Sequence, residues 1–400
     1  MGSHTDSPQC REIFDRSVRR AYSGDSRGSG CSSRWSRNRT GHRRRDDPRA
    51  DSRASACFRR ARRNCFAVVL VTCFFTSGSR GEDPVHLSAY YYPWYDSDGR
   101  HWDEGIASPE GPLLGQYSSR SKETVSRHIE MSKGLGIDTW ICSWWGKESW
   151  EDVTLRSTIL PVLMPTEGEK EKLSFCILYE SAGILGLDPE KGIEFDSETT
   201  EKFVSDLVFI ANRYFSHPSY RKIEGKPVVY LYLSRTFSGD YANAIRRARE
   251  AVGILGFSLY LVGDEVYWGE PDRDRMATLN AVTAYNMHGP KLYANLDDYS
   301  GFIEDCDKVY ARFQSVAKQI GIGFIPGIMP GFDATGTRNG ASYYVIPRKL
   351  SAHGEITFRE AMEQMASHHL DPELNTLALT SFNEWHEGTQ VEPSKSEGAD

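Results

Sequence analysis

The chain has 400 residues, with 48 Lys and Arg against 55 Asp and Glu, which gives a formal net charge of -7. This balance argues against a nucleic-acid-binding protein. The length accommodates one α/β barrel, a fold of about 250 residues, together with an extension. The 9 Trp and 20 Tyr residues suit a cleft that binds sugar, because the apolar face of a pyranose packs on an aromatic ring.

The N-terminal 64 residues are rich in Arg, Ser, Gly and Asp and poor in aliphatic side chains, so we expect a disordered tail. The apolar run 65–75 follows a pair of arginines and is too short for a spanning helix, which needs about 20 residues. Residues 65–80 have the pattern of a signal peptide or a short signal-anchor. We therefore expect the body of the chain to enter the secretory pathway, either secreted or tethered to the Golgi membrane through residues 65–75.

From residue 84 onward, strand-like and helix-like segments alternate. Strands are predicted at 85–95, 137–145, 173–180, 227–233, 257–265, 279–285, 324–329 and 377–385, and helices at 121–134, 150–163, 199–215, 241–255, 299–320 and 358–368. This alternation implies right-handed units around a parallel sheet, and eight strands indicate a closed (β/α)8 TIM barrel. A doubly wound sheet is the alternative, but no glycine-rich phosphate turn follows the first strand.

The barrel domain is predicted over residues 84–400. The stretch 391–400 is polar and has no apolar periodicity, so we expect the domain to be truncated before its final helix. The three cysteines of the domain are scattered and form neither a disulfide framework nor a zinc site.

In barrels of this kind the functional residues lie at the carboxyl ends of the strands. Aromatic and acidic residues recur there: Tyr91, Tyr92, Trp94 and Tyr95; Trp144 and Trp145; Tyr179 and Glu180; Asp264 and Glu265; Tyr285, Asn286 and His288; and Asn383, Glu384 and Glu387. Core positions would carry Val, Ile and Leu instead. The pattern predicts a sugar-binding cleft.

The segment 377–390 begins as an apolar strand and turns polar at Asn383, with Trp385 and His386 between Glu384 and Glu387. Cleavage of a glycosidic bond needs a proton donor for the leaving oxygen and a second carboxylate at the anomeric end. The alternative interpretation is a solvated loop whose acids cap a helix, since glutamates are mostly surface residues. His386 is expected to orient the glutamates by hydrogen bonding.

Several motifs resemble glycoside hydrolase family 99, and the similarity extends from about residue 87 to residue 390. They are Tyr91-Tyr92-Pro93-Trp94-Tyr95, His101-Trp102, Ser143-Trp144-Trp145, Glu180 and, most specifically, Ser381-Phe382-Asn383-Glu384-Trp385-His386-Glu387-Gly388-Thr389-Gln390. The resemblance implies a (β/α)8 retaining endo-hydrolase that needs no metal or cofactor. Its substrate would be an α-mannosyl oligosaccharide or N-glycan, cleaved at internal α-1,2-mannosidic linkages of N-glycans or mannans.

The resemblance also implies roles for individual residues. Glu384 would deprotonate the 2-hydroxyl of the substrate, which attacks as nucleophile to form a 1,2-anhydro sugar, and Glu387 would protonate the leaving oxygen. Glu180 would hold the sugar. The further substrate-binding residues would be Tyr91, Tyr92, Trp94, Tyr95, His101, Trp102, Trp145, Tyr285, Tyr293, Asn383 and His386.

Trp145 is predicted to favour a mannosyl over a glucosyl substrate, because animal Golgi members of the family tend to carry tyrosine there and bacterial mannanases tryptophan. The alternative is that Trp145 packs against the next helix.

A second hypothesis for the whole chain is a non-catalytic barrel that binds mannose oligosaccharides, although two retained glutamates favour the enzyme. We expect a monomer without a nucleic-acid partner.

Overall fold

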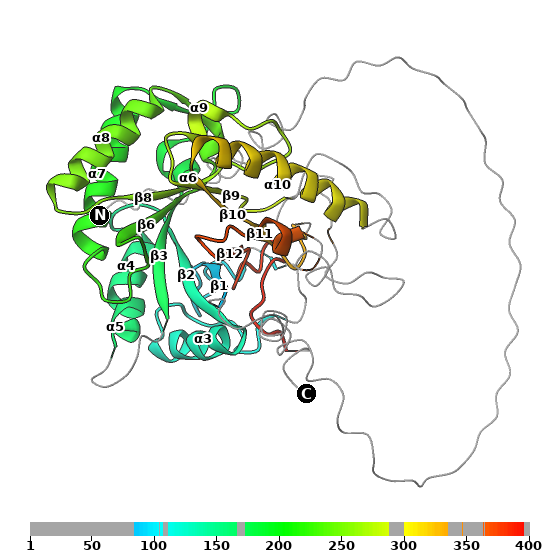
Figure 1. Ribbon diagram of the computed structural model, residues 1–400. Helices are drawn as coiled ribbons and strands as arrows, with labels where there is room; N and C mark the ends of the chain where they lie inside the picture. Colours follow the sequence, from blue (N-terminus) through cyan, green and yellow to red (C-terminus); the bar gives the residue numbers. More distant parts are fainter. Residues whose placement is uncertain are drawn as a thin grey trace, which may run out of the picture.

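The computed structural model describes residues 84–103, 105–106, 111–165, 173–287, 300–334, 346, 363 and 365–395. Within these ranges a sheet of parallel strands curls into a barrel with helices around it (Figure 1). The strands follow one another in the order β10-β9-β8-β6-β3-β2-β1-β12-β11. Their bounds are β1 (His86–Tyr91), β2 (Ile137–Trp144), β3 (Ser174–Tyr179), β6 (Lys226–Leu231), β8 (Tyr260–Asp264), β9 (Ala281–Thr283), β10 (Gly323–Ile325), β11 (Gly327–Ile328) and β12 (Thr376–Leu379).

The two ends of this order, β10 and β11, are consecutive in the chain and are separated only by Pro326. Proline has no backbone N–H for a ladder, but its carbonyl accepts a 3.0 Å hydrogen bond from the Ala378 amide. Gly327 lies so close to the end of β9 that a Cβ there would stand 2.0 Å from the carbonyl oxygen of Ala284, the next residue after that strand. Together β10 and β11 form the predicted seventh strand, so the sheet joins its own ends. The predicted (β/α)8 barrel is confirmed.

Helices with one apolar face cover the outside of the barrel. The N-terminus of α3 (Lys122–Gly134) is capped by Ser121, whose hydroxyl accepts from the Thr124 amide at 3.2 Å. Further helices are α6 (Ser181–Leu185), α7 (Ser197–Tyr214), α8 (Tyr241–Ile254), α9 (Arg273–Met276) and α10 (Ser300–Ile320). Short 3-10 turns occur at η2 (Ser234–Thr236) and η4 (Ala366–His369). These elements agree with the predicted helices apart from their ends and the short additions α6 and α9.

The structure differs from the sequence-based expectation in several local features. The predicted helix 150–163 is interrupted, with α4 (Trp150–Thr154) and α5 (Leu160–Leu163) joined by the π-helix η1 (Leu155–Ile159). A two-stranded parallel sheet, β4 (Ile193–Phe195) with β7 (Phe237–Gly239), and the small strand β5 (Lys222–Ile223) are additions. The last strand, β12, ends earlier than predicted. Most of the predicted helix 358–368 lies outside the described residues.

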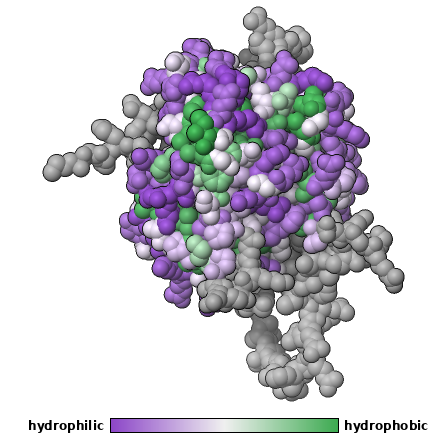
Figure 2. Space-filling model, turned by 60° about the vertical axis from the view of Figure 1, so that its left-hand side comes forward, coloured by the Kyte–Doolittle hydropathy of each residue, from purple (hydrophilic) through white to green (hydrophobic). Residues whose placement is uncertain are grey.

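The visible surface of the described part is mostly hydrophilic, with hydrophobic residues in separate small groups (Figure 2). A helix apolar and long enough to cross a bilayer does not occur in the ranges that the structure describes. The predicted tail 1–64 and the predicted signal segment 65–80 lie outside those ranges and stay predictions, as does the truncation of the domain.

Candidate active site

The polar segment after β12 forms a loop closed at its base by backbone hydrogen bonds. The Phe382 carbonyl accepts from the Glu392 amide at 2.8 Å, and the Ser381 amide donates to the Thr389 carbonyl at the same distance. The Phe382 amide donates to the Tyr90 carbonyl at 2.8 Å, which holds the loop against the end of β1. We call residues 382–392 the glutamate loop, because Glu384 and Glu387 project from it at the carboxyl end of the barrel.

Glu384 is buried and held at both its backbone and its side chain. Its amide donates to the Ser381 hydroxyl at 2.8 Å, and its Oε1 atom accepts from the His386 amide at 3.0 Å. The same oxygen is 3.0 Å from His386 Nδ1, and His386 Nε2 is 2.7 Å from the His101 carbonyl oxygen. A carbonyl can only accept, so Nε2 carries a proton. The predicted role of His386 as an orienting residue is consistent with this geometry.

Glu180 lies at the end of β3, only 4% exposed, and its Oε1 accepts from the Ser143 hydroxyl at 2.6 Å. Burial raises the pKa of the Glu180 carboxyl to about 8, against the lowering effect of the Ser143 hydrogen bond. The negative charges of Glu384 and Glu387 act in the same direction as burial. Glu180 follows β3 and the glutamate loop follows β12, so the three carboxyl groups lie at the same carboxyl end of the parallel barrel.

Three tyrosines surround the same region. Tyr92 and Tyr285 share a short hydrogen bond between their hydroxyls. Burial raises the pKa of Tyr92, and the charges of Glu180 and Glu384 raise it further. The pKa of Tyr232, which follows β6, is raised by burial and then by Glu387 and Glu180. The carboxyl ends of β1, β3, β6, β9 and β12 therefore converge on one acidic, aromatic-walled site.

Trp145 lies beside Glu180 and is half-exposed, at 41%. Its indole Nε1 donates to the Ser143 hydroxyl at 2.9 Å, and that hydroxyl in turn donates to Glu180. The ring packs over Gly183 of α6, where a Cβ would stand 2.2 Å from Trp145 Cζ3. Trp145 therefore does pack against the following helix, α6, as the alternative interpretation predicts. Much of its ring nevertheless stays exposed and can contact a ligand.

The other predicted aromatics form a stacked group beside the glutamate loop. Trp94 stacks on His101 with ring centroids 4.9 Å apart and lies 4.5 Å from Tyr92. Tyr95 stacks on Trp102 at 4.0 Å, and both are buried. Trp94 and His101 are partly exposed, so they can contact a ligand, whereas Tyr95 and Trp102 support them from behind.

Two predicted site residues have structural positions instead. Tyr91 is fully buried on the opposite side of β1 from Tyr92, stacked at 4.1 Å on Trp140. Asn383 is fully buried and bridges strands: its amide group accepts from the Tyr92 amide at 2.8 Å and donates to the Tyr92 carbonyl at 3.0 Å. Both residues shape the site without facing it. Tyr293 and His288 lie outside the described residues.

Sequence analysis missed two acids near this site. Glu151 of α4 is buried, its pKa is raised by burial, and its charge influences Glu180. Glu392, the last residue of the glutamate loop, is buried. Its carboxylate accepts hydrogen bonds from Tyr117 and Trp385 and lies close to His128. Neither follows a predicted strand directly, so the rule of searching strand ends could not find them. Tyr232 does follow a strand and could have been selected.

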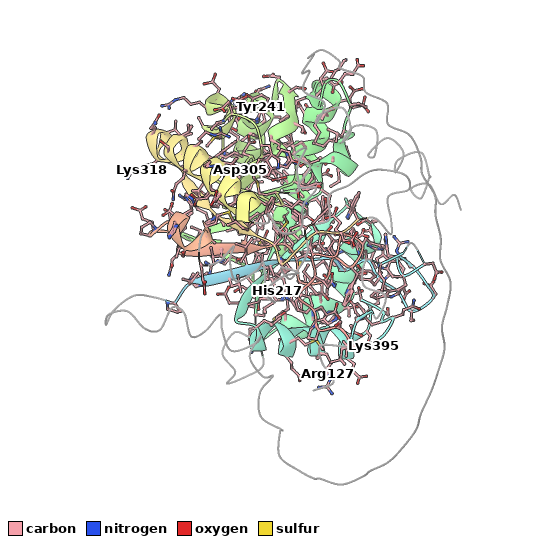
Figure 3. All side chains as sticks on the ribbon, turned by 90° about the vertical axis from the view of Figure 1, so that its right-hand side faces the viewer. Arg127, His217, Tyr241, Asp305, Lys318 and Lys395 are labelled. Atoms are coloured by element: carbon pink, nitrogen blue, oxygen red, sulfur yellow. The ribbon has the colours of Figure 1, made fainter. Side chains whose placement is uncertain are left out.

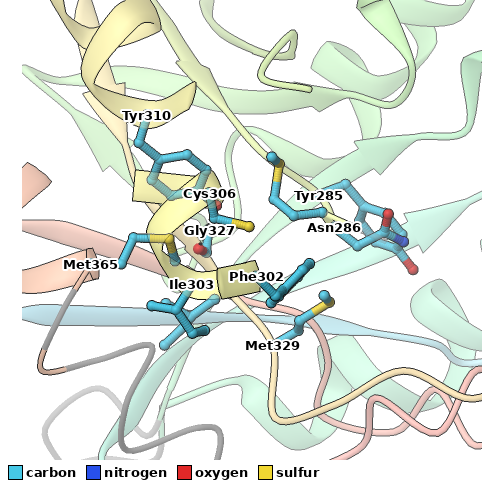
Figure 4. Close-up of a pocket in the computed structure, with 11 residues that line it drawn as sticks. Tyr285, Asn286, Phe302, Ile303, Cys306, Tyr310, Gly327, Met329 and Met365 are labelled. Atoms are coloured by element: carbon cyan, nitrogen blue, oxygen red, sulfur yellow. Dashed lines mark hydrogen bonds between the residues drawn. The ribbon is translucent and has the colours of Figure 1, made fainter. Parts of the chain in front are cut away.

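A separate cavity of about 20 Å³ lies between α10 and β11, lined on one side by Tyr285 (Figure 4). Its other lining side chains are almost all apolar, among them Phe302, Ile303, Met329 and Met365. It has room for about one water molecule and is no sugar site. In the described ranges, no group of three or more His, Cys, Asp or Glu side chains is arranged to hold a metal ion.

Comparison with known proteins supports a carbohydrate-active family. A family model described as "Glycosyltransferase WbsX" matches residues 103–400. Glycoprotein endo-alpha-1,2-mannosidase of Mus musculus is 22% identical over 345 residues, which cover 76% of this chain and 67% of that protein. The endo-alpha-1,2-mannosidase-like protein of Homo sapiens is 24% identical over 343 residues, with 76% and 68% covered.

Solved structures agree in fold. The GH99 endo-alpha-mannosidase from Bacteroides thetaiotaomicron superposes with a TM-score of 0.55 at 21% identity, over 77% of this chain and 88% of that chain. A glycoside hydrolase-like protein superposes with a TM-score of 0.61 at 19% identity, over 78% and 88%. These matches agree in fold with the resemblance to glycoside hydrolase family 99 that the motifs predict. The chain belongs to the family whose model is described as Glycosyltransferase WbsX.

Proposed function

We propose that this chain is an endo-acting, retaining glycoside hydrolase that cleaves internal α-1,2-mannosidic linkages in N-glycans or mannans. The proposal rests chiefly on one observation: Glu180, which follows β3, and Glu384 and Glu387, which follow β12, lie at the same carboxyl end of the parallel barrel, where Tyr92 and Tyr285 share a hydrogen bond. The names of the similar endo-alpha-1,2-mannosidases suggest the linkage.

In the proposed first step the Glu384 carboxylate takes the proton of the sugar 2-hydroxyl. The freed oxygen attacks the anomeric carbon and forms a 1,2-anhydro sugar, while Glu387 protonates the departing glycosidic oxygen. In the second step Glu387 takes a proton from water, the water oxygen opens the three-membered ring at the anomeric carbon, and Glu384 returns its proton to the 2-oxygen. Two inversions give net retention of configuration.

The geometry around Glu384 supports its proposed role as base. The His386 amide donates to Oε1, and His386 Nδ1 lies 3.0 Å from the same oxygen, so the orientation of the carboxylate is fixed while the sugar binds. His386 is itself anchored on the His101 carbonyl.

Glu180 suits a binding role better than a base role. With its pKa raised to about 8, the carboxyl is largely protonated at neutral pH. A protonated carboxyl can donate one hydrogen bond and accept others, so it can grip a sugar hydroxyl group in the reacting subsite. Trp145, linked to Glu180 through Ser143, offers its exposed ring to the neighbouring sugar.

The deciding experiment incubates the full chain with an α-1,2-linked mannosyl oligosaccharide, beside the variant Glu387→Gln. We expect a reducing-end product with retained anomeric configuration, seen by NMR, and no product from the variant. Binding of the oligosaccharide without product from either protein would favour the non-catalytic binding barrel. Addition of a sugar nucleotide with an acceptor sugar tests the transferase activity that the family description names; transfer without hydrolysis would contradict our proposal.

For localisation and assembly we propose passage through the secretory pathway, either secreted or retained at the Golgi membrane, and a monomeric enzyme. The apolar run 65–75 after a basic segment supports the first part. Fractionation of cells expressing the full chain, with protease protection of the catalytic domain, tests this placement.

A further inference from the structure

The segment after the catalytic glutamates turns back under the glutamate loop. The Lys395 amide donates to the Gly111 carbonyl at 3.2 Å, and Ser394 forms an antiparallel bridge with Pro112. In Figure 3 the labelled Lys395 lies at the same end of the molecule as Arg127 of α3, far from Tyr241. Sequence analysis assigned this segment no function beyond a polar loop, yet it places one acid, Glu392, beneath the loop.

Glu392 is 1% exposed, and three side chains lie within hydrogen-bonding distance of its carboxylate. Its Oε2 atom accepts from the Tyr117 hydroxyl and from Trp385 Nε1, each at 2.8 Å. Its Oε1 atom is 3.2 Å from Nε2 of His128, on α3. The other ring nitrogen of His128 is 3.0 Å from the Tyr91 hydroxyl. A buried carboxylate costs several kcal/mol of desolvation, so its presence here calls for a specific reason.

The Glu392 carboxylate holds Trp385 by a hydrogen bond. Trp385 stands between the two catalytic glutamates, and its indole is held at Nε1 by Glu392 while its backbone amide contacts the Tyr95 hydroxyl at 3.2 Å. With both ends held, the indole cannot turn, and the backbone on either side of it keeps its direction. Glu392 thus closes the base of the loop through its backbone amide and fixes the centre of the loop through its carboxylate.

We infer that Glu392 is a positioning residue, whose carboxylate sets the separation and direction of Glu384 and Glu387 through Trp385. This inference rests on the proposed function, because it takes those two glutamates as the reacting groups. Glu392 does not touch the substrate. Its effect should appear in the rate of the chemical step and not in substrate affinity, since a misplacement of about 1 Å can cost roughly 100-fold in rate.

Two variants of similar volume separate the hydrogen bonds from the packing. In Glu392→Gln, the amide oxygen can take the place of Oε2 and accept from Tyr117 and Trp385, and the amide nitrogen can donate to His128. In Glu392→Leu, the hydroxyl and the indole N–H lose their acceptor and are left buried without it. Asp371→Asn is the control, because Asp371 accepts the Glu373 and Leu374 amides at the amino-terminal end of β12, away from the site.

Steady-state kinetics on the mannosyl oligosaccharide, below the melting temperature of every variant, gives the first result. We expect Glu392→Leu to lower kcat about 100-fold with KM changed less than about 3-fold, and Glu392→Gln to recover kcat to within about 5-fold of the unmodified chain. Asp371→Asn should lower the melting temperature and leave kcat unchanged. A normal kcat in folded Glu392→Leu, or a loss confined to KM, would overturn the inference.

Amide hydrogen exchange in the peptide 382–392 gives a result that does not depend on turnover. Exchange there should be about 10-fold faster in Glu392→Leu and unchanged in Glu392→Gln and Asp371→Asn. If the unmodified chain hydrolyses nothing, the proposed function fails while this measurement still decides the positioning role. If Glu392→Leu does not fold, Trp385→Phe, which removes only the Nε1 donor, replaces it; unchanged exchange in that variant would overturn the inference.

Discussion

Two pairs of acids lie at the carboxyl end of the barrel, and they have different partners. Asp264 ends β8 and Glu265 follows it, while Glu384 and Glu387 follow β12. Glu265 accepts two hydrogen bonds from Arg275 Nε, at 2.9 and 3.1 Å, and Asp264 accepts from Arg235 at 2.5 Å. Glu384 pairs instead with His386. Both pairs look alike in the sequence. The acids of β8 form ion pairs with arginines, whereas those that follow β12 are surrounded by tyrosines and a histidine.

The difference separates a structural role from a chemical one. A carboxylate held by a guanidinium has its oxygens occupied in fixed, charge-assisted hydrogen bonds, so it stabilises the fold and is less available to a substrate. A carboxylate next to an imidazole and other acids can have its proton affinity adjusted for acid–base chemistry. The acids on β12 therefore fit catalysis, and those on β8 fit the support of the neighbouring loops.

The largest effect is expected at the β12 pair. Glu387→Gln removes the proposed proton donor and Glu384→Gln the proposed base, without changing side-chain size. Each should lower kcat on the mannosyl oligosaccharide by roughly 10⁴-fold, because the groups act on the same transition state. Single-turnover rates measure this loss. Leaving-group activation with a fluorophenyl glycoside should restore much of the rate in Glu387→Gln only; equal rescue in both variants would contradict the assigned roles.

The β8 pair should show its effect in stability. Glu265→Ala leaves the mostly buried Arg275 with Asp272 as its remaining ion-pair partner among the described residues. The loss of this buried partner should lower the free energy of unfolding by about 3 kcal/mol. Urea unfolding measures the change. Glu270→Ala is the matched control, since Glu270 pairs with Arg312 at the surface and its loss should cost less than about 1 kcal/mol.

A drop of kcat in Glu265→Ala as large as that in Glu384→Gln would abolish the distinction between the two pairs. Unchanged stability in both Glu265→Ala and Glu270→Ala would show that the arginine contacts of β8 contribute nothing. Either result would move the search for catalytic residues back to the whole rim of the barrel.

The sequence was informative wherever a feature depends on neighbours along the chain. Alternating apolar segments predicted all eight barrel positions, and the dense motif around Glu384 predicted the acidic site. The different positions of Tyr91 and Tyr92 could have been predicted from the sequence. Consecutive residues of an extended strand point to opposite faces, so Tyr91 and Tyr92 could not both face one ligand. Applied to β1, that rule would have assigned Tyr91 to the core.

Features that depend on contacts between distant segments could not be predicted this way. Arg275 neutralises Glu265 from a short helix ten residues later, and Glu392 reaches Tyr117 and His128 across more than 260 positions. The early end of β12 has the same origin, because Ser381 leaves the strand to pair with Thr389. Only the folded chain shows which acids have which partners.

Glu180 should make stability depend on pH. Its folded pKa of about 8 lies above the ordinary value near 4.3, so between these values the folded state keeps a proton that the unfolded state has lost. Stability therefore falls as pH rises across this window. Glu180→Gln cannot ionise and should gain about 2 to 4 kcal/mol relative to the unmodified chain at pH 8, and almost nothing at pH 4.

Urea unfolding at a series of pH values measures this difference between the two proteins. A gain in Glu180→Gln that is equal at pH 4 and pH 8 would show that packing, and not ionisation, is responsible.

The smallest expected effect concerns the choice of sugar at Trp145. Its only polar atom, Nε1, is engaged by Ser143, so the exposed part of the ring offers stacking and no hydroxyl. We expect the unmodified chain to prefer a mannosyl over a glucosyl substrate. The variant Trp145→Tyr introduces a hydroxyl and a smaller ring. It should shift the ratio of kcat/KM toward the glucosyl substrate by about 10-fold, which corresponds to about 1.4 kcal/mol. Trp268→Phe is the control, because Trp268 Nε1 donates to the Met287 carbonyl and this tryptophan packs near Phe302. A ratio that moves equally in both variants, or an unmodified chain that turns over the two substrates at equal rates, would show that Trp145 does not select the sugar.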